Sequence, residues 1–299
     1  MDTGPGSNRT TSQASQVAER IAALDPETCH EEIARHLYAS EFSWDIERAL
    51  EFALFRTYAV PAISGLLAAT GEFEHRPRKR YDDTELVLAE VIEHGLDSSR
   101  GKRSIARMNA MHGRFDIDDA AMRYVLSTFV CEPIRWLERF GRRGMSEREQ
   151  RAWFLYYRGL GVRMGIKRIP DDLADLMRLN REYEAANFRH AGTNRRIGEA
   201  TRDMLLGFYL PRWLIPAGRP VAHAFLDPVL LDSMGFPAAP KWLQRAIMAT
   251  MRMRARVLRR LPPRRHPRYL TRVPRPTYPE GYRIEELGTF RTTEAQPDE

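Results

Sequence analysis

Cysteine is scarce in this sequence. The 299 residues contain two, Cys29 and Cys131, which lie far apart and in no spacing that binds a metal. This usage is typical of free thiols in a reducing compartment rather than of a disulfide scaffold. A chain of this length can bury a substantial core, so it needs no such staples.

Long apolar runs are absent as well. No stretch approaches the ~20 apolar residues that a membrane-spanning helix requires. Residues 1–15 are rich in glycine, serine and threonine, and they lack the apolar segment of a signal peptide. We therefore expect a cytoplasmic protein.

Several sequence signatures of catalysis are also missing. The chain has no glycine-rich phosphate loop, no His-Glu-x-x-His and no Gly-x-Ser-x-Gly. These absences speak against nucleotide-binding, zinc-protease and α/β-hydrolase functions. Strand-like alternation of useful length is missing too, and no internal repeat is visible.

Helical periodicity is what the sequence does contain. From about residue 15 onward, apolar residues recur at helical spacing and are interrupted by proline and glycine. We therefore predict an all-α fold, a single large domain over residues 14–288 with a cofactor pocket buried between helices. Residues 1–13 and 289–299 are predicted to be disordered tails.

One predicted helix carries a histidine on an apolar face. Ile105, Met108, His112 and Phe115 recur at offsets of three, four and three, so they share one side of this helix. The spacing alone favours a core histidine that hydrogen-bonds a neighbour. A metal or heme ligand is the alternative, because neutral imidazole is the commonest metal ligand.

The preceding predicted helix carries a polar group. Arg80 and Thr84 are four residues apart and share a helix face, with Asp83 beside them. A loop over residues 95–101 turns the chain back toward the histidine helix. Two antiparallel helices can therefore bring these side chains and His112 to one pocket.

Four segments of the chain resemble those of a known family: KRYDDT, RGKRSIARMNAMHGRF, YVLSTFVCEPIRWLERFG and LGVRMGIKRIP. The family comprises all-helical, oxygenase-like proteins. Its characterised members are the bacterial latex-clearing (rubber) oxygenase and the endoplasmic-reticulum-bound oxygenase of fungal mycophenolic acid biosynthesis. The resemblance covers roughly residues 40–288.

This resemblance implies a b-type heme, molecular oxygen as a partner and an apolar, isoprenoid or lipid-like substrate. His112 matches the proximal iron ligand of the family, whereas Arg80 and Thr84 match an arginine and a threonine on the other side of the heme. Asp83 falls where the rubber enzymes carry a lysine. Because an acid cannot act as a lysine does near heme, the substrate or the chemistry is expected to differ. Catalytic or orienting roles for Arg80, Asp83 and Thr84 follow from the resemblance.

Two further residues of the histidine helix are assigned to cofactor binding. Met108 shares the apolar face, and Asn109, about one turn before His112, is expected to hydrogen-bond within the same helix face. Since no Cys-x-x-Cys-His sequence occurs, the heme would be held by ligation and packing rather than by covalent attachment.

Histidines elsewhere in the chain are weaker candidates for metal binding. His30 and His36 lie close to Glu31 and Glu32, but such a group on an amphipathic helix is more typical of solvated surface. His190 stands among polar residues, and a lone loop histidine is a poor second iron ligand.

Arginine dominates the last part of the chain. No acidic residue occurs between Ser233 and Pro279, and ten arginines fall between residues 251 and 275. Three interpretations of this basic region are open: it contacts nucleic acid, it contacts an anionic membrane surface, or it is a solvated tail packed on the body of the protein. Basic amphipathic helices suit membrane surfaces best, so residues 242–275 are expected to contact anionic membrane peripherally. No nucleic-acid motif is present, and no such partner is expected.

A shorter basic run, residues 75–80, precedes the Arg80 helix and is expected to be a solvated loop. Taken with the resemblance, the sequence predicts a heme-dependent, oxygenase-like oxidoreductase. The alternative is a non-catalytic helical protein that binds a lipid-like ligand or a membrane. A strong Soret band from the purified protein would favour the first.

Overall fold

The computed structural model describes residues 19–261, 264 and 266–288. Within these residues the chain forms helices and no strand, apart from one isolated bridge between Arg275 and Tyr278. The prediction of an all-α single domain is confirmed. The predicted tails, 1–13 and 289–299, lie outside the described residues.

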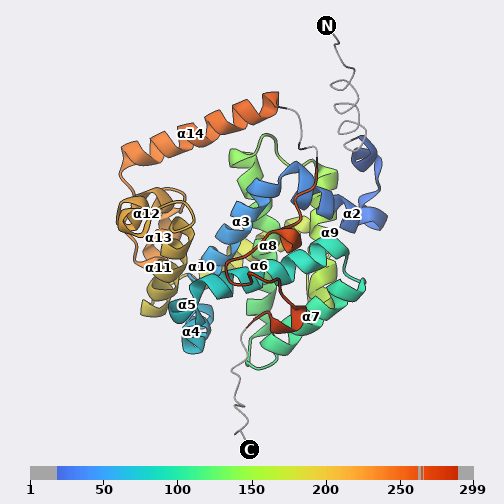
Figure 1. The fold of residues 1–299 in the computed structure, drawn as a ribbon, viewed down its shortest axis with the longest axis horizontal. Coiled ribbons are helices and arrows are strands. Elements are labelled where there is room, and N and C mark those ends of the chain that lie inside the picture. The colour runs from blue at the N-terminus through green and yellow to red at the C-terminus, as the bar shows by residue number, and fades with distance from the viewer. Residues whose placement is uncertain (1–18, 262–263, 265, 289–299) are drawn as a thin grey trace, which may run out of the picture.

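The helices follow one another with short connections (Figure 1). In chain order they are α2 (Pro26–His36), the π-helix η1 (Leu37–Glu41), α3 (Ser43–Thr57), α4 (Pro61–Thr70), α5 (Glu72–His75), α6 (Pro77–His94), α7 (Ser99–His112), α8 (Asp119–Phe140), α9 (Glu147–Arg163), α10 (Leu173–Asn187), α11 (Gly192–Leu206), the 3-10 turn η2 (Arg212–Leu214), α12 (Ile215–His223), α13 (Pro228–Met234), α14 (Lys241–Arg260) and the 3-10 turns η3 (Leu270–Arg272) and η4 (Ile284–Glu286).

Helix α8 lies at the centre of the fold. It packs against α3, α9, α10 and α14, while α2 lies along α9. Fully burying one large apolar side chain contributes about 1.5–3 kcal/mol, more than a typical exposed ion pair. The largest fully buried side chains include Trp153, Tyr124, Tyr156, Phe42 and Phe154.

Local sequence signals set several helix ends. Ser146 and Glu149 form a capping box at the start of α9, in which the Ser146 amide donates to Glu149 Oε2 at 2.7 Å. Pro61 occupies the first turn of α4, where a missing N–H costs nothing. Gly71, with a φ of +70°, ends that helix in the left-handed region.

Two expectations about helix boundaries were wrong. Helix α7 ends at His112, so Phe115 lies beyond it and is 41% exposed instead of sharing the apolar face. Gly113 follows directly and favours termination there. The basic run 75–80 is not a loop, because α5 includes His75 and α6 begins at Pro77.

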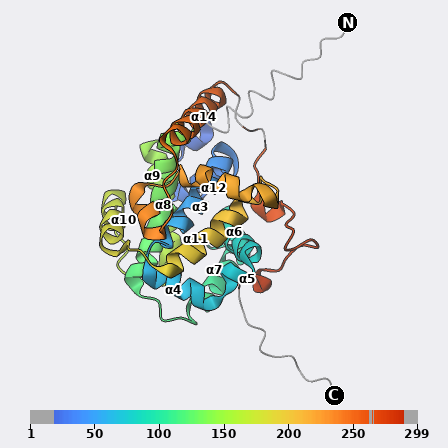
Figure 2. The ribbon, with the colours of Figure 1, turned by 90° about the vertical axis from the view of Figure 1, so that its left-hand side faces the viewer.

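A second cluster of helices lies on one side of the α8 core (Figure 1). Helix α11 packs against α4, α5, α12 and α13. These helices enclose a smaller apolar core of their own, to which Phe55, Tyr58 and Ile197 contribute. Seen from the side, α14 runs along the edge of the molecule (Figure 2), with Met251 and Ala255 buried against the body.

Membrane-spanning length is not reached by any one helix in the described part of the chain. The pair α3 and α4 passes the same length and composition test together, but the two are bent by 99°.

After α14 the chain returns across α6. We call residues 268–288 the C-terminal strap. Glu93 of α6 accepts hydrogen bonds from the Leu270 amide at 2.6 Å and the Thr271 hydroxyl at 2.5 Å. Farther along, the Tyr282 hydroxyl donates to Glu90 at 2.5 Å. The strap therefore supplies further hydrogen-bond donors to carboxylates on the buried face of α6.

Candidate functional site

Helices α6 and α7 are antiparallel neighbours whose connection is tightly specified. Ser98 caps α7 by accepting from the Gly101 amide at 2.9 Å. A Cβ on Gly101 would lie 2.0 Å from the Gly95 carbonyl oxygen, so only glycine fits there. The Ser104 hydroxyl donates to the Val87 carbonyl at 2.7 Å and ties the two helices together. The two predicted site segments are thus held side by side.

Arg80 and Thr84 form the predicted pair on α6. The Arg80 Nη1 group donates to Thr84 Oγ1, and the Thr84 hydroxyl donates to the Arg80 carbonyl at 2.8 Å. The guanidinium lies 5.3 Å from the Phe73 ring centroid, and burial lowers its pKa. Among the described residues, Arg80 has no acidic partner at ion-pair distance.

His112 stands at the end of α7 with an unsatisfied ring nitrogen. Its Nδ1 is buried and has no hydrogen-bond partner among the described residues. Burial, with a smaller contribution from the charge of Arg80, lowers the pKa of His112 to about 4. The imidazole is therefore neutral near pH 7, the form that binds metals. The positive charge of Arg80 thus acts on the protonation of this imidazole.

Asp83 is buried and has partners of its own. Lys79 Nζ donates to it at 2.7 Å, and the Tyr278 hydroxyl of the strap also donates to it. Burial and this acceptor raise the pKa of Tyr278. Asp83 still acts on the pKa of Arg80 through its charge. It therefore lies beside the site, with its carboxylate held by the strap.

The two other predicted cofactor residues differ in their surroundings. Met108 is 4% exposed and belongs to the main apolar core. Asn109 does not hydrogen-bond within its own helix face as expected, because its Nδ2 donates to the Arg163 carbonyl at the end of α9, at 3.0 Å. The Arg163 carbonyl is the last of α9, where no further helical N–H is available to it, so it accepts from the Asn109 amide.

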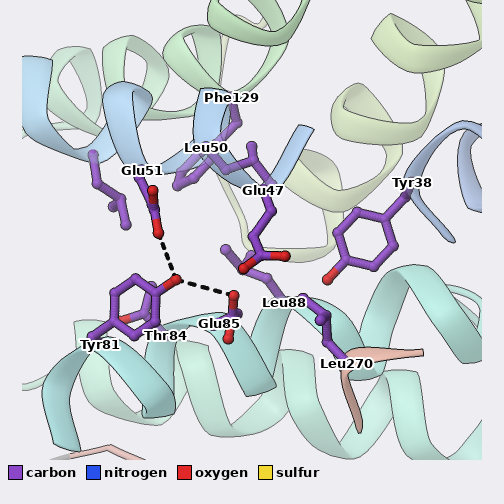
Figure 3. Close-up of a pocket in the computed structure, with 11 residues that line it drawn as sticks. Tyr38, Glu47, Leu50, Glu51, Tyr81, Thr84, Glu85, Leu88, Phe129 and Leu270 are labelled. Atoms are coloured by element: carbon purple, nitrogen blue, oxygen red, sulfur yellow. Dashed lines mark hydrogen bonds between the residues drawn. The ribbon is translucent and has the colours of Figure 1, made fainter. Parts of the chain in front are cut away.

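A cavity of about 40 Å³, with Thr84 in its wall, is lined by leucines as well as by acidic and tyrosine side chains (Figure 3). Tyr81 donates to Glu51 at 2.7 Å and also contacts Glu85 at 3.2 Å. Burial raises the pKa of Glu51 to about 8. Sequence reasoning missed this group, although Tyr81 and Glu85 flank the Arg80–Thr84 pair at the same four-residue spacing.

The candidate site can offer a metal only one protein ligand. In the described part of the chain, no three His, Cys, Asp or Glu side chains gather as a chelating group. His30 Nδ1 lies 3.3 Å from the Glu27 carbonyl oxygen, to which it can only donate, and His190 is exposed near Gly235. His112 is the histidine with a buried, unpaired nitrogen.

Comparison with known proteins identifies the family. The family described as "ER-bound oxygenase mpaB/B'/Rubber oxygenase, catalytic domain" matches residues 49–260. The chain is 31% identical over 255 residues to ER-bound oxygenase mpaB' of Penicillium brevicompactum, which covers 78% of this chain and 59% of that protein. It is 30% identical over 213 residues to ER-bound oxygenase mpaB of Penicillium roqueforti (strain FM164), covering 65% of this chain and 71% of the relative.

The chain thus spans less than two thirds of the mpaB' relative. A shorter match, 36% identical over 141 residues, is to ER-bound oxygenase mpaB of Penicillium brevicompactum and covers 45% of this chain and 36% of that protein. The matched residues 49–260 include α6, α7 and all of the predicted site residues. This chain belongs to the family of the ER-bound oxygenase mpaB and rubber oxygenase catalytic domain.

Proposed function

We propose that this chain is a heme-dependent, oxygenase-like oxidoreductase in which His112 ligates the iron of heme b. One observation carries the proposal: His112 Nδ1 is buried, unpaired and on a neutral ring beside Arg80. A buried polar atom without a partner costs free energy unless a ligand satisfies it. Family membership supports the oxygenase activity.

The donor set fits heme better than a bare metal ion. The porphyrin brings four nitrogen ligands, so the protein needs to supply only one imidazole. When bound, heme iron supplies the redox chemistry with molecular oxygen. Arg80, which is half-buried and has no ion pair among the described residues, could also bind an anionic group of the cofactor or substrate. A guanidinium binds carboxylate or polarised oxygen through directed N–H groups.

The proposal gives Arg80 and Thr84 separate tasks. Thr84 accepts from Arg80 Nη1 and thereby fixes the guanidinium. The remaining N–H groups of Arg80 can then orient oxygen or substrate at the open side of the pocket. The expected substrate is apolar, isoprenoid or lipid-like, in keeping with Leu50, Leu54 and Leu88 around the neighbouring cavity.

Asp83 provides a test of the edge of this site. Asp83→Lys places an amine where the rubber oxygenases carry a lysine, and we expect the heme spectrum to shift toward a six-coordinate form. Tyr278→Phe is the matched control, because it removes the strap contact of Asp83 without adding a nitrogen ligand. An unchanged spectrum in a folded, heme-loaded Asp83→Lys protein would place Asp83 outside the site.

A second role, contact with an anionic membrane, is favoured by the exposed face of α14. Trp242, Met253 and Val257 are 70%, 54% and 48% exposed and recur at helical spacing. An arginine stripe runs beside them, and none of its members pairs with an acid among the described residues. These exposed arginines are Arg245, Arg252, Arg256, Arg259 and Arg260. We propose that this face docks peripherally on anionic lipid.

Vesicle co-sedimentation tests the docking. The triple variant Arg252→Gln, Arg256→Gln and Arg259→Gln should bind phosphatidylserine vesicles ~100-fold more weakly, since each basic residue near such a surface contributes about 1 kcal/mol. Raising the salt concentration should weaken the wild type as well.

A variant with the same net charge controls for non-specific attraction. It carries Arg20→Gln, Arg158→Gln and Arg178→Gln, all outside α14, and should bind nearly as the wild type does. Equal sedimentation with phosphatidylcholine and phosphatidylserine vesicles, or with neither, would remove the membrane proposal. If the protein instead binds anionic vesicles selectively but is colourless after heme supplementation, the chain is better described as a non-catalytic helical lipid-binding or membrane-binding protein.

A further inference from the structure

A second cleft, of about 290 Å³, lies between α11, α12 and the loop after α13. It shares no residue with the His112 site or with the cavity beside Thr84. Three arginines line it, together with a histidine and an aromatic ring. The residues used below are Arg195, Arg202, Arg219, His223 and Phe236.

Close helix packing builds this cleft. A Cβ on Gly218 would lie 2.6 Å from Leu210 Cδ1, so α12 can approach the end of α11 only with glycine there. On α11, a Cβ on Gly198 would lie 3.1 Å from Phe236 Cζ, and the glycine leaves room for this ring. Phe236 in turn stacks on His223, with ring centroids 4.8 Å apart and planes inclined by 14°.

Arg202 is the buried cation of the cleft. Its side chain is 5% exposed, and its Nε donates to Asp203 Oδ1 at 2.8 Å. Its guanidinium carbon lies 4.9 Å from the Phe236 ring centroid. Nη1 contacts His223 Nε2 at 3.1 Å, whereas Nη2 has no partner among the described residues. Because Nη2 is not sealed in the interior, this edge of the guanidinium lines the cleft and is free to donate to an acceptor.

His223 orients Arg202 rather than adding charge. Its Nδ1 lies 2.9 Å from the Pro237 carbonyl oxygen, to which it can only donate. The other nitrogen, Nε2, then accepts from Arg202 Nη1. Burial and the charge of Arg202 both lower the pKa of His223, which keeps this neutral tautomer at pH 7.

The two other arginines are held in the same manner, by one edge each. Arg219 donates from Nε and Nη2 to Asp203, at 3.2 and 2.7 Å. Arg195 donates from Nε to Glu199 at 3.0 Å. Two carboxylates thus position three guanidiniums and leave a net positive charge, with unused N–H groups on each arginine.

We propose that this cleft binds a phosphate group, either of a free phosphate compound or of a lipid headgroup. Guanidinium groups recognise phosphate oxygens through paired N–H donors, and three of them suit an anion with three terminal oxygens. The volume exceeds that of phosphate alone and leaves room for a small ester substituent. This site is independent of the proposed heme function.

The site is tested by measuring the binding of inorganic phosphate and of glycerol 3-phosphate to the full chain. Both ³¹P NMR and calorimetry can measure this binding. Wild type should show saturable binding with one site. Arg202→Gln and Arg219→Gln should each weaken it by at least tenfold, while Arg252→Gln on α14 should leave it unchanged. Arg219 is 44% exposed, so its substitution tests the site even where loss of buried Arg202 disturbs folding.

The outcomes separate the sources of phosphate. Preference for glycerol 3-phosphate over nanodiscs with phosphatidic acid supports a free compound, and the reverse preference supports a lipid headgroup. No saturable binding to either, or equal binding by wild type and Arg219→Gln, would overturn the proposal. Heme content is measured alongside, since its loss in a folded Arg219→Gln protein would assign these arginines to the heme and overturn a separate site.

Discussion

His112→Ala is expected to abolish heme binding while the helical fold survives. The substitution removes the one buried, unpaired imidazole nitrogen of the site, and the described residues offer no chelating group to replace it. The helical core rests on other side chains, such as Trp153 and Tyr156, so circular dichroism should be nearly unchanged. Heme content per chain, measured by the Soret band and by iron analysis, should fall at least tenfold.

Two comparisons make this result decisive. Asn109→Ala, on the same helix, loses only the hydrogen bond to Arg163 and should keep its heme. Full heme occupancy in a well-folded His112→Ala protein would falsify the assignment of the ligand. A wild-type protein that never takes up heme, and that is merely destabilised by His112→Ala, would show instead that His112 is a core histidine.

Arg56→Ala is expected to cause the largest loss of stability. Arg56 lies on α3 and pairs with Glu184 of α10 at 2.6 Å and with Asp227, the cap of α13, at 2.5 Å. Glu132 of α8 lies 3.6 Å away. Removing the cation leaves Glu184 and Asp227 without this counter-charge, whereas Glu132 keeps its ion pair with Arg135. Such a loss costs about 3–5 kcal/mol, measurable as a lower urea midpoint.

An exposed ion pair provides the control for Arg56. Arg178 pairs with Asp175 at 2.5 Å on the surface of α10, and Arg178→Ala should change the free energy of unfolding by no more than ~1 kcal/mol. Burial alone would raise the pKa of Asp227, but the charge of Arg56 holds this pKa below its ordinary value. The pair therefore stabilises the fold at neutral pH, and the difference between wild type and Arg56→Ala should narrow as the solution is acidified. A cost near that of Arg178→Ala would contradict the account.

Local signals in the sequence predicted much of the helical framework. Apolar periodicity and caps such as Ser146 act within a few residues, so they could be read without the fold. The pairing of Arg80 with Thr84 followed from helix spacing, and the packing of their helix on the one that carries His112 followed from one short loop. The resemblance, not the spacing, supplied the assignment of heme.

Contacts between distant segments could not be read in the same way. Nothing near Asp83 in the sequence predicts that Tyr278 will donate to its carboxylate, because the two residues are 195 positions apart. Asn109 finds its partner on α9 for the same reason. The error at Phe115 had a local cause: the periodic pattern continued past Gly113, where the helix in fact stops.

Because of the C-terminal strap, the bounds of the family match are a poor guide to where the chain can be truncated. The matched region, 49–260, excludes α2, which lies along α9, and it also excludes the strap. A fragment with those ends would expose the apolar side of α9 and leave α6 with an uncovered row of carboxylates. Its helix α7 would lose the contact between Arg107 Nε and the Leu287 carbonyl, at 2.6 Å. We therefore expect a stable protein to need residues 19–288, which include α2 and the strap in addition to the matched region.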